Sequence, residues 1–184
     1  MRKRGLRSSV LLIATVAIVV ATGSAVASGY EGTADDFTQI SLLMTKYSYA
    51  LDNRDAQGWA SVFTEEGLFR AAQFCLVGRK ELAGLIDKQN ARPAPADAAT
   101  RPKTRHINGN LAIEYLDHDN ALSHSFVMVV GDVGRDHTGG GIQVTGTYDD
   151  KLKRVRGHWL ISDRLEVSPG DGPPLICPAT AKSP

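Results

Sequence analysis

Asp52 stands where a carboxylate could take part in proton transfer. Apolar residues recur before it at steps of three and four, the spacing of one buried helix face: Phe37, Ile40, Met44, Tyr47 and Leu51. Asp52 would then close the helix at the border of that face, beside the negative end of the helix dipole. Spacing alone favours a plainer alternative, a solvated turn over residues 52–55 in which Asp55 caps the next helix.

His106 is the second candidate, because an imidazole titrates near neutrality and can abstract or return a proton. It lies in a β-prone segment, where a histidine can also be a satisfied core or rim residue. The pair Asn108-Gly109 is a hairpin signal that would put His106 beside a solvent-exposed turn. We prefer a β-bulge at Gly109. Without it, His106, Asn108 and Asn110 would face away from the apolar side chains of the same strand: Ile107, Leu111, Ile113 and Tyr115.

His124 is predicted to face inward, either lining a pocket or hydrogen-bonded in the core, because it alternates with Leu122, Phe126 and Met128. A metal triad of His124 with Asp52 and His106 can be imagined, but nothing in their spacing supports it beyond residue type. The sequence also lacks a glycine-rich phosphate loop and a nucleophile elbow. We therefore expect neither a metal nor a cofactor.

The elements that must position these side chains are helices followed by strands. Helices are predicted over residues 34–52, 55–66 and from 78 to before Pro93, and strands over 68–75, 104–115, 121–130, 142–152 and 159–167. This order indicates an α+β fold, with three N-terminal helices packed on a strongly curved, mostly antiparallel sheet. A sheet that wraps one long helix forms a cone, and the open end of a cone is a natural small-molecule pocket.

Residues 1–27 read as a secretory signal peptide. A basic head precedes an apolar run over residues 10–21, and Ala25-Val26-Ala27 has the small-residue pattern of a cleavage site. The run is too short for a stable membrane span. Removing four of the 21 basic residues leaves 17 against 20 acidic ones, a net charge of −3. We expect a secreted or periplasmic protein with no electrostatic reason to bind nucleic acid or anionic lipid.

Whether Cys75 and Cys177 form a disulfide depends on whether the protein is exported. An oxidising compartment allows a lone pair of thiols to form a bridge, so we expect a disulfide that ties down the C-terminal tail, residues 169–184. The alternative is a pair of buried free thiols.

Short motifs follow one another along nearly the whole chain after the signal: Ile40, Leu43, Tyr47, Ala50-Leu51-Asp52, Asp55, Trp59, Phe63-Thr64, Gly67, Arg105-His106, Asn110, Gly146-Thr147-Tyr148 and Gly157-His158-Trp159. Their order and spacing resemble the SnoaL-like branch of the nuclear-transport-factor-two-like superfamily. The resemblance implies an α+β cone over residues 28–168 with a deep pocket, often dimeric through the outer face of the sheet.

The resemblance also implies a site. In dehydratase-like members, a tyrosine, an aspartate five residues later and a histidine at the start of a central strand meet in the pocket, which here assigns catalytic roles to Tyr47, Asp52 and His106. The chain departs from scytalone dehydratase, whose second catalytic histidine lies about one strand later, because His124 is out of register with it. Six further residues are expected to line the pocket: Trp59, Phe63, Asn110, His124, Phe126 and Tyr148.

Three functions are compatible with these features. The first is an exported, cofactor-free lyase, isomerase or cyclase acting on a small apolar oxygenated substrate through His106 and Asp52. The second is a non-catalytic small-molecule binding protein of the same fold, and the third is an accessory subunit. The pair of Asp52 and His106 favours the enzyme, because a pure binder has little reason to place a carboxylate in an apolar cavity.

Overall fold

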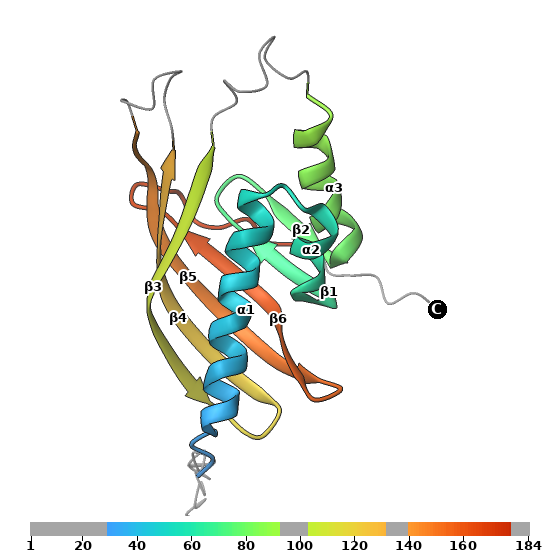
Figure 1. Ribbon diagram of the computed structural model, residues 1–184, viewed down its shortest axis with the longest axis vertical. Coiled ribbons are helices and arrows are strands. Elements are labelled where there is room, and N and C mark those ends of the chain that lie inside the picture. The colour runs from blue at the N-terminus through green and yellow to red at the C-terminus, as the bar shows by residue number, and fades with distance from the viewer. Residues whose placement is uncertain (1–28, 93–102, 132–139, 178–184) are drawn as a thin grey trace, which may run out of the picture.

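The computed structural model describes residues 29–92, 103–131 and 140–177, which form an α+β fold. Helix α1 (Ala34–Asp52) lies across the sheet, while α2 (Ala56–Ser61) and α3 (Gly78–Asn90) lie beside its β1–β2 edge (Figure 1). The predicted signal, residues 1–27, lies outside the described residues. No helix in the described ranges combines the length and the hydropathy that a bilayer span needs.

Six strands form one sheet in the order β2-β1-β6-β5-β4-β3. They are β1 (Phe63–Arg70), β2 (Cys75–Val77), β3 (Thr104–Tyr115), β4 (Asn120–Gly131), β5 (Gly141–Val155) and β6 (His158–Val167). Every neighbouring pair is antiparallel except β1 and β6, which run parallel. The sheet curves around α1 (Figure 1), so the predicted helices on a curved, mostly antiparallel sheet are confirmed.

The predicted strand over residues 68–75 was wrong in its bounds. The segment forms two strands, because β1 already begins at Phe63 and the chain turns back before Cys75. The buried Phe63 pairs with Ile161 of β6, and this contact extends the strand through the polar residues Glu65 and Glu66. The second helix is correspondingly shorter than expected and ends at Ser61.

Helix α1 begins with a capping box. Thr33 accepts a hydrogen bond from the Asp36 backbone N–H (3.1 Å), and the Asp36 carboxylate accepts one from the Thr33 N–H (3.0 Å). That carboxylate is itself buried and also accepts from Arg154 (2.5 Å) and Trp159 (3.0 Å), which joins the helix start to β5 and β6. Phe37, expected on the buried face, is 54% exposed because Asp36 occupies the inward position.

An aromatic core fills the space between the helices and the inner face of the sheet. Trp59 packs against Tyr47, Phe63 and Phe69 with ring centroids 5.6–5.9 Å apart, and Tyr47 also contacts Tyr148 at 5.6 Å. All five rings are at most 4% exposed. Such packing fixes α1 and α2 over the sheet.

Two β-bulges decide which side chains reach that inner face. In β3 the register shifts between Gly109 and Ala112, and Asn110 adopts a positive φ of 53°. The predicted bulge is therefore confirmed: His106 and Asn108 lie on the same face as the apolar side chains that follow it, Leu111, Ile113 and Tyr115. In β6, Ile161 pairs with Leu152 but Asp163 pairs with Lys151, so an extra residue at 162 reverses the alternation.

Cys75 and Cys177 form the expected disulfide, with Cα atoms 5.5 Å apart. The bond joins the C-terminal segment to β2, and the Leu175 N–H adds a hydrogen bond to the Ala71 carbonyl (3.3 Å). The cross-link spans 102 residues of sequence. In the chain-entropy model a loop of this length stabilises the fold by about 4–5 kcal/mol.

Candidate active site

Asp52 and His106 meet at one end of the molecule. Asp52 is the last residue of α1, and His106 is the third residue of β3. The imidazole Nδ1 lies 2.8 Å from Asp52 Oδ1, and the His106 backbone N–H donates to both carboxylate oxygens at 3.1 and 3.2 Å. Their side chains are 17% and 10% exposed, so solvent reaches the pair without surrounding it. The predicted proximity is confirmed. The alternative holds in part: the chain turns at residues 53–54 and Asp55 caps α2, accepting a hydrogen bond from the Gly58 N–H (2.8 Å), but Asp52 itself belongs to α1 and is not solvated.

The face of α1 that carries Asp52 contacts the sheet at every fourth residue. One turn earlier, Ser48 Oγ accepts a hydrogen bond from Asn108 Nδ2 (2.8 Å). A further turn back, Met44 Sδ accepts one from Arg164 Nη2 (2.9 Å). Side chains four apart lie on one helix face. Asp52 is thus the last of three polar contacts that hold α1 in a single register against β3 and β6.

Arg164 is a fully buried cation on the inner face of β6. Its guanidinium donates two hydrogen bonds to Asp150 on β5, both 2.7 Å, and is stacked between the rings of Tyr47 and Tyr148 at 4.0 and 4.1 Å. Burial by itself would lower the pKa of Arg164, but the Asp150 carboxylate outweighs burial and raises that pKa well above its ordinary value. The site therefore contains a permanent positive charge.

Several polar atoms in this region have no hydrogen-bond partner among the described residues, although all are buried: Tyr47 Oη, Asn108 Oδ1, Ser125 Oγ and Arg164 Nη1. Burial raises the pKa of Tyr47 and raises that of Tyr148 well above its ordinary value. Both phenols are neutral at physiological pH and can donate. Buried polar groups are normally paired. Arg164 Nη1 is therefore a donor that the described residues do not use, while the Tyr47 hydroxyl lies close enough to Arg164 and Tyr148 for both to influence its pKa.

Glu166 completes the charged groups of the inner face. It is the register partner of Tyr148 and lies two residues beyond Arg164. Burial raises the pKa of Glu166, while charge interactions with Arg164 and with His106, when His106 is protonated, act in the opposite direction. The inner face thus carries an imidazole, a fixed cation and three carboxylates: Asp52, Asp150 and Glu166.

The residues predicted to line the pocket fall into two groups, one buried on the inner face of the sheet and one on its outer face or in the β3 bulge. Trp59, Phe63 and Tyr148 are buried in the aromatic core that adjoins Arg164. Tyr47 is fully buried and contacts Tyr148 and Arg164, but no hydrogen bond joins it to His106 or Asp52. The expected catalytic tyrosine therefore contacts Arg164 and is not joined to the dyad, the pair formed by Asp52 and His106.

The inward orientation predicted for His124 and Phe126 was wrong. The inner face of β4 carries Ala121, Ser123, Ser125 and Val127, so the alternate residues point outward. His124 pairs with Asp149 on the exposed outer face (2.6 Å), and Phe126 is 37% exposed there. Asn110 is also exposed, because it occupies the bulge of β3. These three residues do not line the inner face.

Arg164, Asp150 and Glu166 were missed by the sequence reasoning. Strict alternation from Trp159 and Ile161 places Arg164 and Glu166 outside, and only the bulge at residue 162 brings them in. Asp150 offered a usable signal, because it alternates with the inward Tyr148 and Leu152. A carboxylate at an inward position requires a buried partner, which here is Arg164.

Among the described residues, no group of three His, Cys, Asp or Glu side chains is placed to hold a metal ion. The imidazole, carboxylate, phenol and guanidinium groups are those of general acid–base chemistry with stabilisation of a developing negative charge.

The sequence model of the SnoaL-like domain family matches residues 32–165. No functionally curated protein is similar enough in sequence to match the chain. Solved structures share the fold. One is a protein of unknown function from Mycobacterium tuberculosis, with 27% sequence identity over 76% of this chain and 78% of that chain, and a TM-score of 0.62.

Two further structures come from other bacteria. A candidate scytalone dehydratase from Novosphingobium aromaticivorans shares 24% identity over 73% of this chain and 84% of that chain, with a TM-score of 0.58. ActVI-ORFA from Streptomyces coelicolor shares 21% identity over 74% of this chain and 97% of that chain, with a TM-score of 0.64.

Proposed function

The chain belongs to the SnoaL-like domain family, and from this membership and the dyad geometry we propose that it is a cofactor-independent acid–base enzyme. The reaction class is dehydration, isomerisation or cyclisation of a small, largely apolar oxygenated molecule. A fold neighbour described as a candidate scytalone dehydratase supports this class, and so does the mixture of aromatic and ionisable side chains on the inner face.

His106 is the proposed proton carrier. With its proton on Nδ1, the imidazole donates to Asp52 Oδ1, and the lone pair of Nε2 is available to a substrate C–H or O–H. The Asp52 carboxylate cannot rotate away, because the His106 backbone N–H holds both of its oxygens. The carboxylate then stabilises the imidazolium that forms when Nε2 takes the proton, and His106 returns that proton to a leaving hydroxyl or to carbon.

Tyr47 and Arg164 are the proposed binders of the substrate oxygen. Abstraction of a proton beside a carbonyl transfers negative charge to the carbonyl oxygen, and donors aimed at that oxygen lower the barrier. The Tyr47 hydroxyl and Arg164 Nη1 are both buried and have no partner among the described residues. The stacked tyrosines and Asp150 fix Arg164 in advance, so little reorganisation is needed during the reaction.

One observation carries this proposal: the imidazole and carboxylate are joined at 2.8 Å in a partly buried position, across two elements far apart in the sequence. In a binding protein that only encloses an apolar ligand, the pair would serve solely to hold the end of α1 against β3, and partial burial of the carboxylate would oppose that gain. The two functions therefore differ in whether His106 moves a proton, which the following experiment measures.

Proton abstraction can be tested before the substrate is known. A panel of aromatic and alicyclic β-hydroxy ketones is incubated with the full chain in D₂O, and deuterium incorporation beside the carbonyl is followed by NMR. His106→Ala is expected to reduce the exchange rate of any responsive ketone by about 10²–10⁴-fold. Asp52→Asn is expected to lose much of the same factor, because the imidazole tautomer is no longer held.

The chain provides a matched control for this experiment. His124 pairs with Asp149 in the same way (2.6 Å) but on the exposed outer face of the sheet. His124→Ala should leave the exchange rate unchanged. If ketones bind the wild type and exchange at the same rate with His106→Ala, the proposed chemistry is wrong and the non-catalytic binder is preferred.

A further inference from the structure

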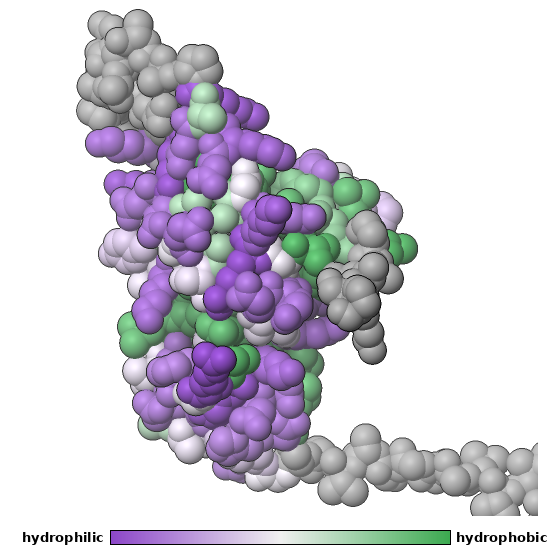
Figure 2. All heavy atoms as spheres, turned by 90° about the vertical axis from the view of Figure 1, so that its right-hand side faces the viewer, coloured by the Kyte–Doolittle hydropathy of each residue, from purple (hydrophilic) through white to green (hydrophobic). Residues whose placement is uncertain are grey.

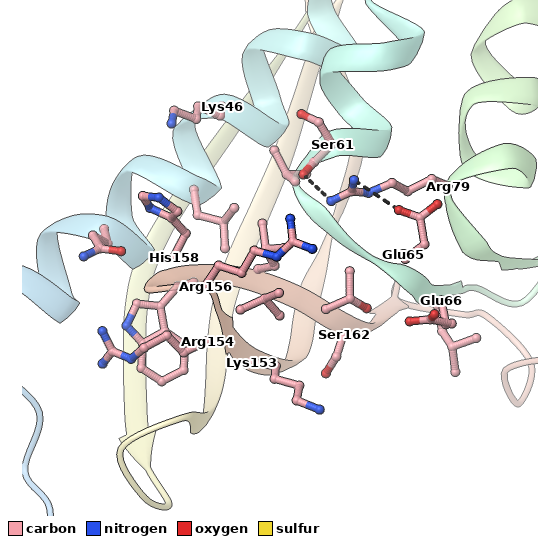
Figure 3. Close-up of a pocket in the computed structure, with 18 of the residues that line it drawn as sticks. Lys46, Ser61, Glu65, Glu66, Arg79, Lys153, Arg154, Arg156, His158 and Ser162 are labelled. Carbon is pink, nitrogen blue, oxygen red and sulfur yellow. Dashed lines mark hydrogen bonds and ion pairs between the residues drawn. The ribbon is translucent and has the colours of Figure 1, made fainter.

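A recess opens on a part of the molecule away from the dyad. It is a groove of about 1500 Å³ between α1, β1 and the hairpin that joins β5 to β6. None of its lining residues belongs to the dyad or to the Arg164 cluster, which consists of Arg164, Asp150, Tyr47 and Tyr148. Figure 3 shows Lys46 bordering it from α1, Arg156 reaching in from the hairpin, and Glu65 and Glu66 on the opposite side. Whatever this groove binds would not touch His106.

The base of the groove is apolar. It includes Leu43 and Leu42 from α1, Val62 before β1, and Leu160 from β6. Leu42 is 52% exposed, so part of this apolar surface is open to solvent. From the side of the molecule shown in Figure 2, hydrophilic side chains surround patches of apolar ones. An apolar base with a polar rim suits a ligand that has both characters.

The rim is strongly basic. Five Lys or Arg side chains line the groove against two acidic ones, a net charge of +3 with His158 neutral, whereas the chain after residue 27 carries −3 overall. Arg79 and Arg154 are engaged by backbone carbonyls and carboxylates. No ion pair or side-chain hydrogen bond to another described residue involves the side chains of Lys46, Lys153 or Arg156.

These cations come from elements that only the fold brings together, since Lys46 lies on α1 and the other two lie near the turn between β5 and β6. The same groups would repel one another unless solvent or an anion compensates them. Their position beside exposed apolar surface, in an otherwise acidic chain, gives the groove a charge opposite to that of its surroundings.

We propose that this groove binds a small amphipathic anion, with its apolar body on Leu42, Leu43 and Leu160 and its negative head between Lys46 and Arg156. The occupant is a single dissolved molecule with one carboxylate, sulfate or phosphate head. The groove has walls on three elements, whereas a membrane surface or a nucleic-acid duplex needs a broad convex or extended cationic face.

The test uses four probes that share a ten-carbon chain, each below its micellar concentration. Decanoate and decyl phosphate are expected to bind the full chain by calorimetry, while decyl maltoside binds more weakly and decyltrimethylammonium weakest of all. Lys46→Gln and Arg156→Gln should each weaken decanoate binding by about two- to fivefold, because each removes one partly exposed charge contact. Added salt should weaken it in the same direction.

Lys80→Gln is the matched control, because Lys80 is an exposed lysine on α3 outside the groove. It should not change decanoate affinity, and neither should His106→Ala, which separates this site from the proposed active site. Equal affinity for the cationic and anionic probes would overturn the proposal. So would binding to vesicles of anionic lipid without binding to decanoate, since that result identifies a membrane surface instead.

Discussion

His106 and His124 show how little a residue pair says about function until its surroundings are known. Each imidazole lies within hydrogen-bond distance of an aspartate, at 2.8 and 2.6 Å. The side chains of the His124 pair are 50–56% exposed, whereas those of the His106 pair are 10–17% exposed. Water screens charges on the outer face of the sheet. The electrostatic interaction between imidazole and carboxylate is therefore stronger on the inner face than on the outer face.

Arg164 connects the site to the stability of the fold. It is completely buried. Among the described residues, Asp150 is the one carboxylate that forms an ion pair with it and compensates its charge. Removing one partner of such a pair leaves an uncompensated buried charge, which typically costs about 3–5 kcal/mol. Loss of activity in an Arg164 variant could then reflect unfolding, so the test of the mechanism uses His106 and Asp52.

Asp36 should make the stability of the protein depend on pH. Burial raises the pKa of its carboxyl, but the hydrogen bonds from Tyr30, Trp159 and Arg154 outweigh burial and hold that pKa well below its ordinary value of 3.8. A lowered folded-state pKa contributes stability that is present above 3.8 and is lost as pH falls toward the folded-state value. Asp36→Asn should therefore cost about 1–3 kcal/mol of unfolding free energy at pH 7.

Urea unfolding at pH 7 and pH 3 measures this effect. The difference between wild type and Asp36→Asn should narrow at pH 3, because the wild type has begun to lose the contribution that the variant lacks. Asp35→Asn is the control, since Asp35 is exposed and, within the described ranges, its carboxylate hydrogen-bonds only the Gln39 side chain. A constant difference at both pH values would show that the Asp36 charge is not the stabilising group.

At the level of elements, the strands after residue 103 could be predicted to within three residues at each end, because turns and β-branched runs bound them. The bulge at Gly109 could be predicted too, since His106 and the apolar residues that follow lie in opposite phases without it. The bulge at residue 162 gave no such conflict, because strict alternation already yields one mostly apolar phase: Trp159, Ile161, Leu165 and Val167. The inward position of Arg164 could therefore not be predicted from the sequence.

Strand β4 was misoriented for a related reason. Its larger apolar side chains, Leu122, Phe126 and Met128, lie on the outer face, while the inner face carries small residues such as Ala121 and Ser125. The inner residues are small because the aromatic core and Tyr148 already occupy the space beneath them. Alternation identifies two faces, but residue size alone does not say which one the helices cover.

At the level of the whole molecule, apolar side chains are exposed on the outer face of the sheet, which the helices do not cover. Phe126 pairs with Thr147, which pairs with Val167, so the three form one row across β4, β5 and β6, with Ile107 on the neighbouring strand. Ile107, Phe126 and Val167 are 37–52% exposed. An exposed apolar patch on a sheet face is typical of an interface. We propose that two copies associate through this face.

Light scattering at micromolar concentration should therefore give the mass of a dimer. Phe126→Glu should shift it to a monomer by placing a charge in the interface, whereas Tyr49→Glu should not, because Tyr49 is an exposed aromatic on α1. A monomeric wild type would contradict the proposed assembly and leave the outer patch without this role.

Export is proposed from the N-terminal 27 residues and agrees with the Cys75–Cys177 disulfide, since such bonds persist in oxidising compartments. When the full chain is expressed in a bacterium with a general secretion pathway, the protein recovered from the periplasm or medium should begin near Ser28. An intact mass that still contains Met1 to Ala27 would count against cleavage.

The strand order also bears on how the protein is made. Strand β6 lies between β1 and β5, yet it leaves the ribosome last of the six. Arg70 of β1 forms a double hydrogen bond with Asp163, 93 residues further along the chain. Contacts of such long range form slowly, because the intervening chain must first be ordered. A nascent chain that ends before residue 158 has helices and strand edges but no central strand, so the sheet and the cluster around Arg164 can assemble only once synthesis has passed residue 167.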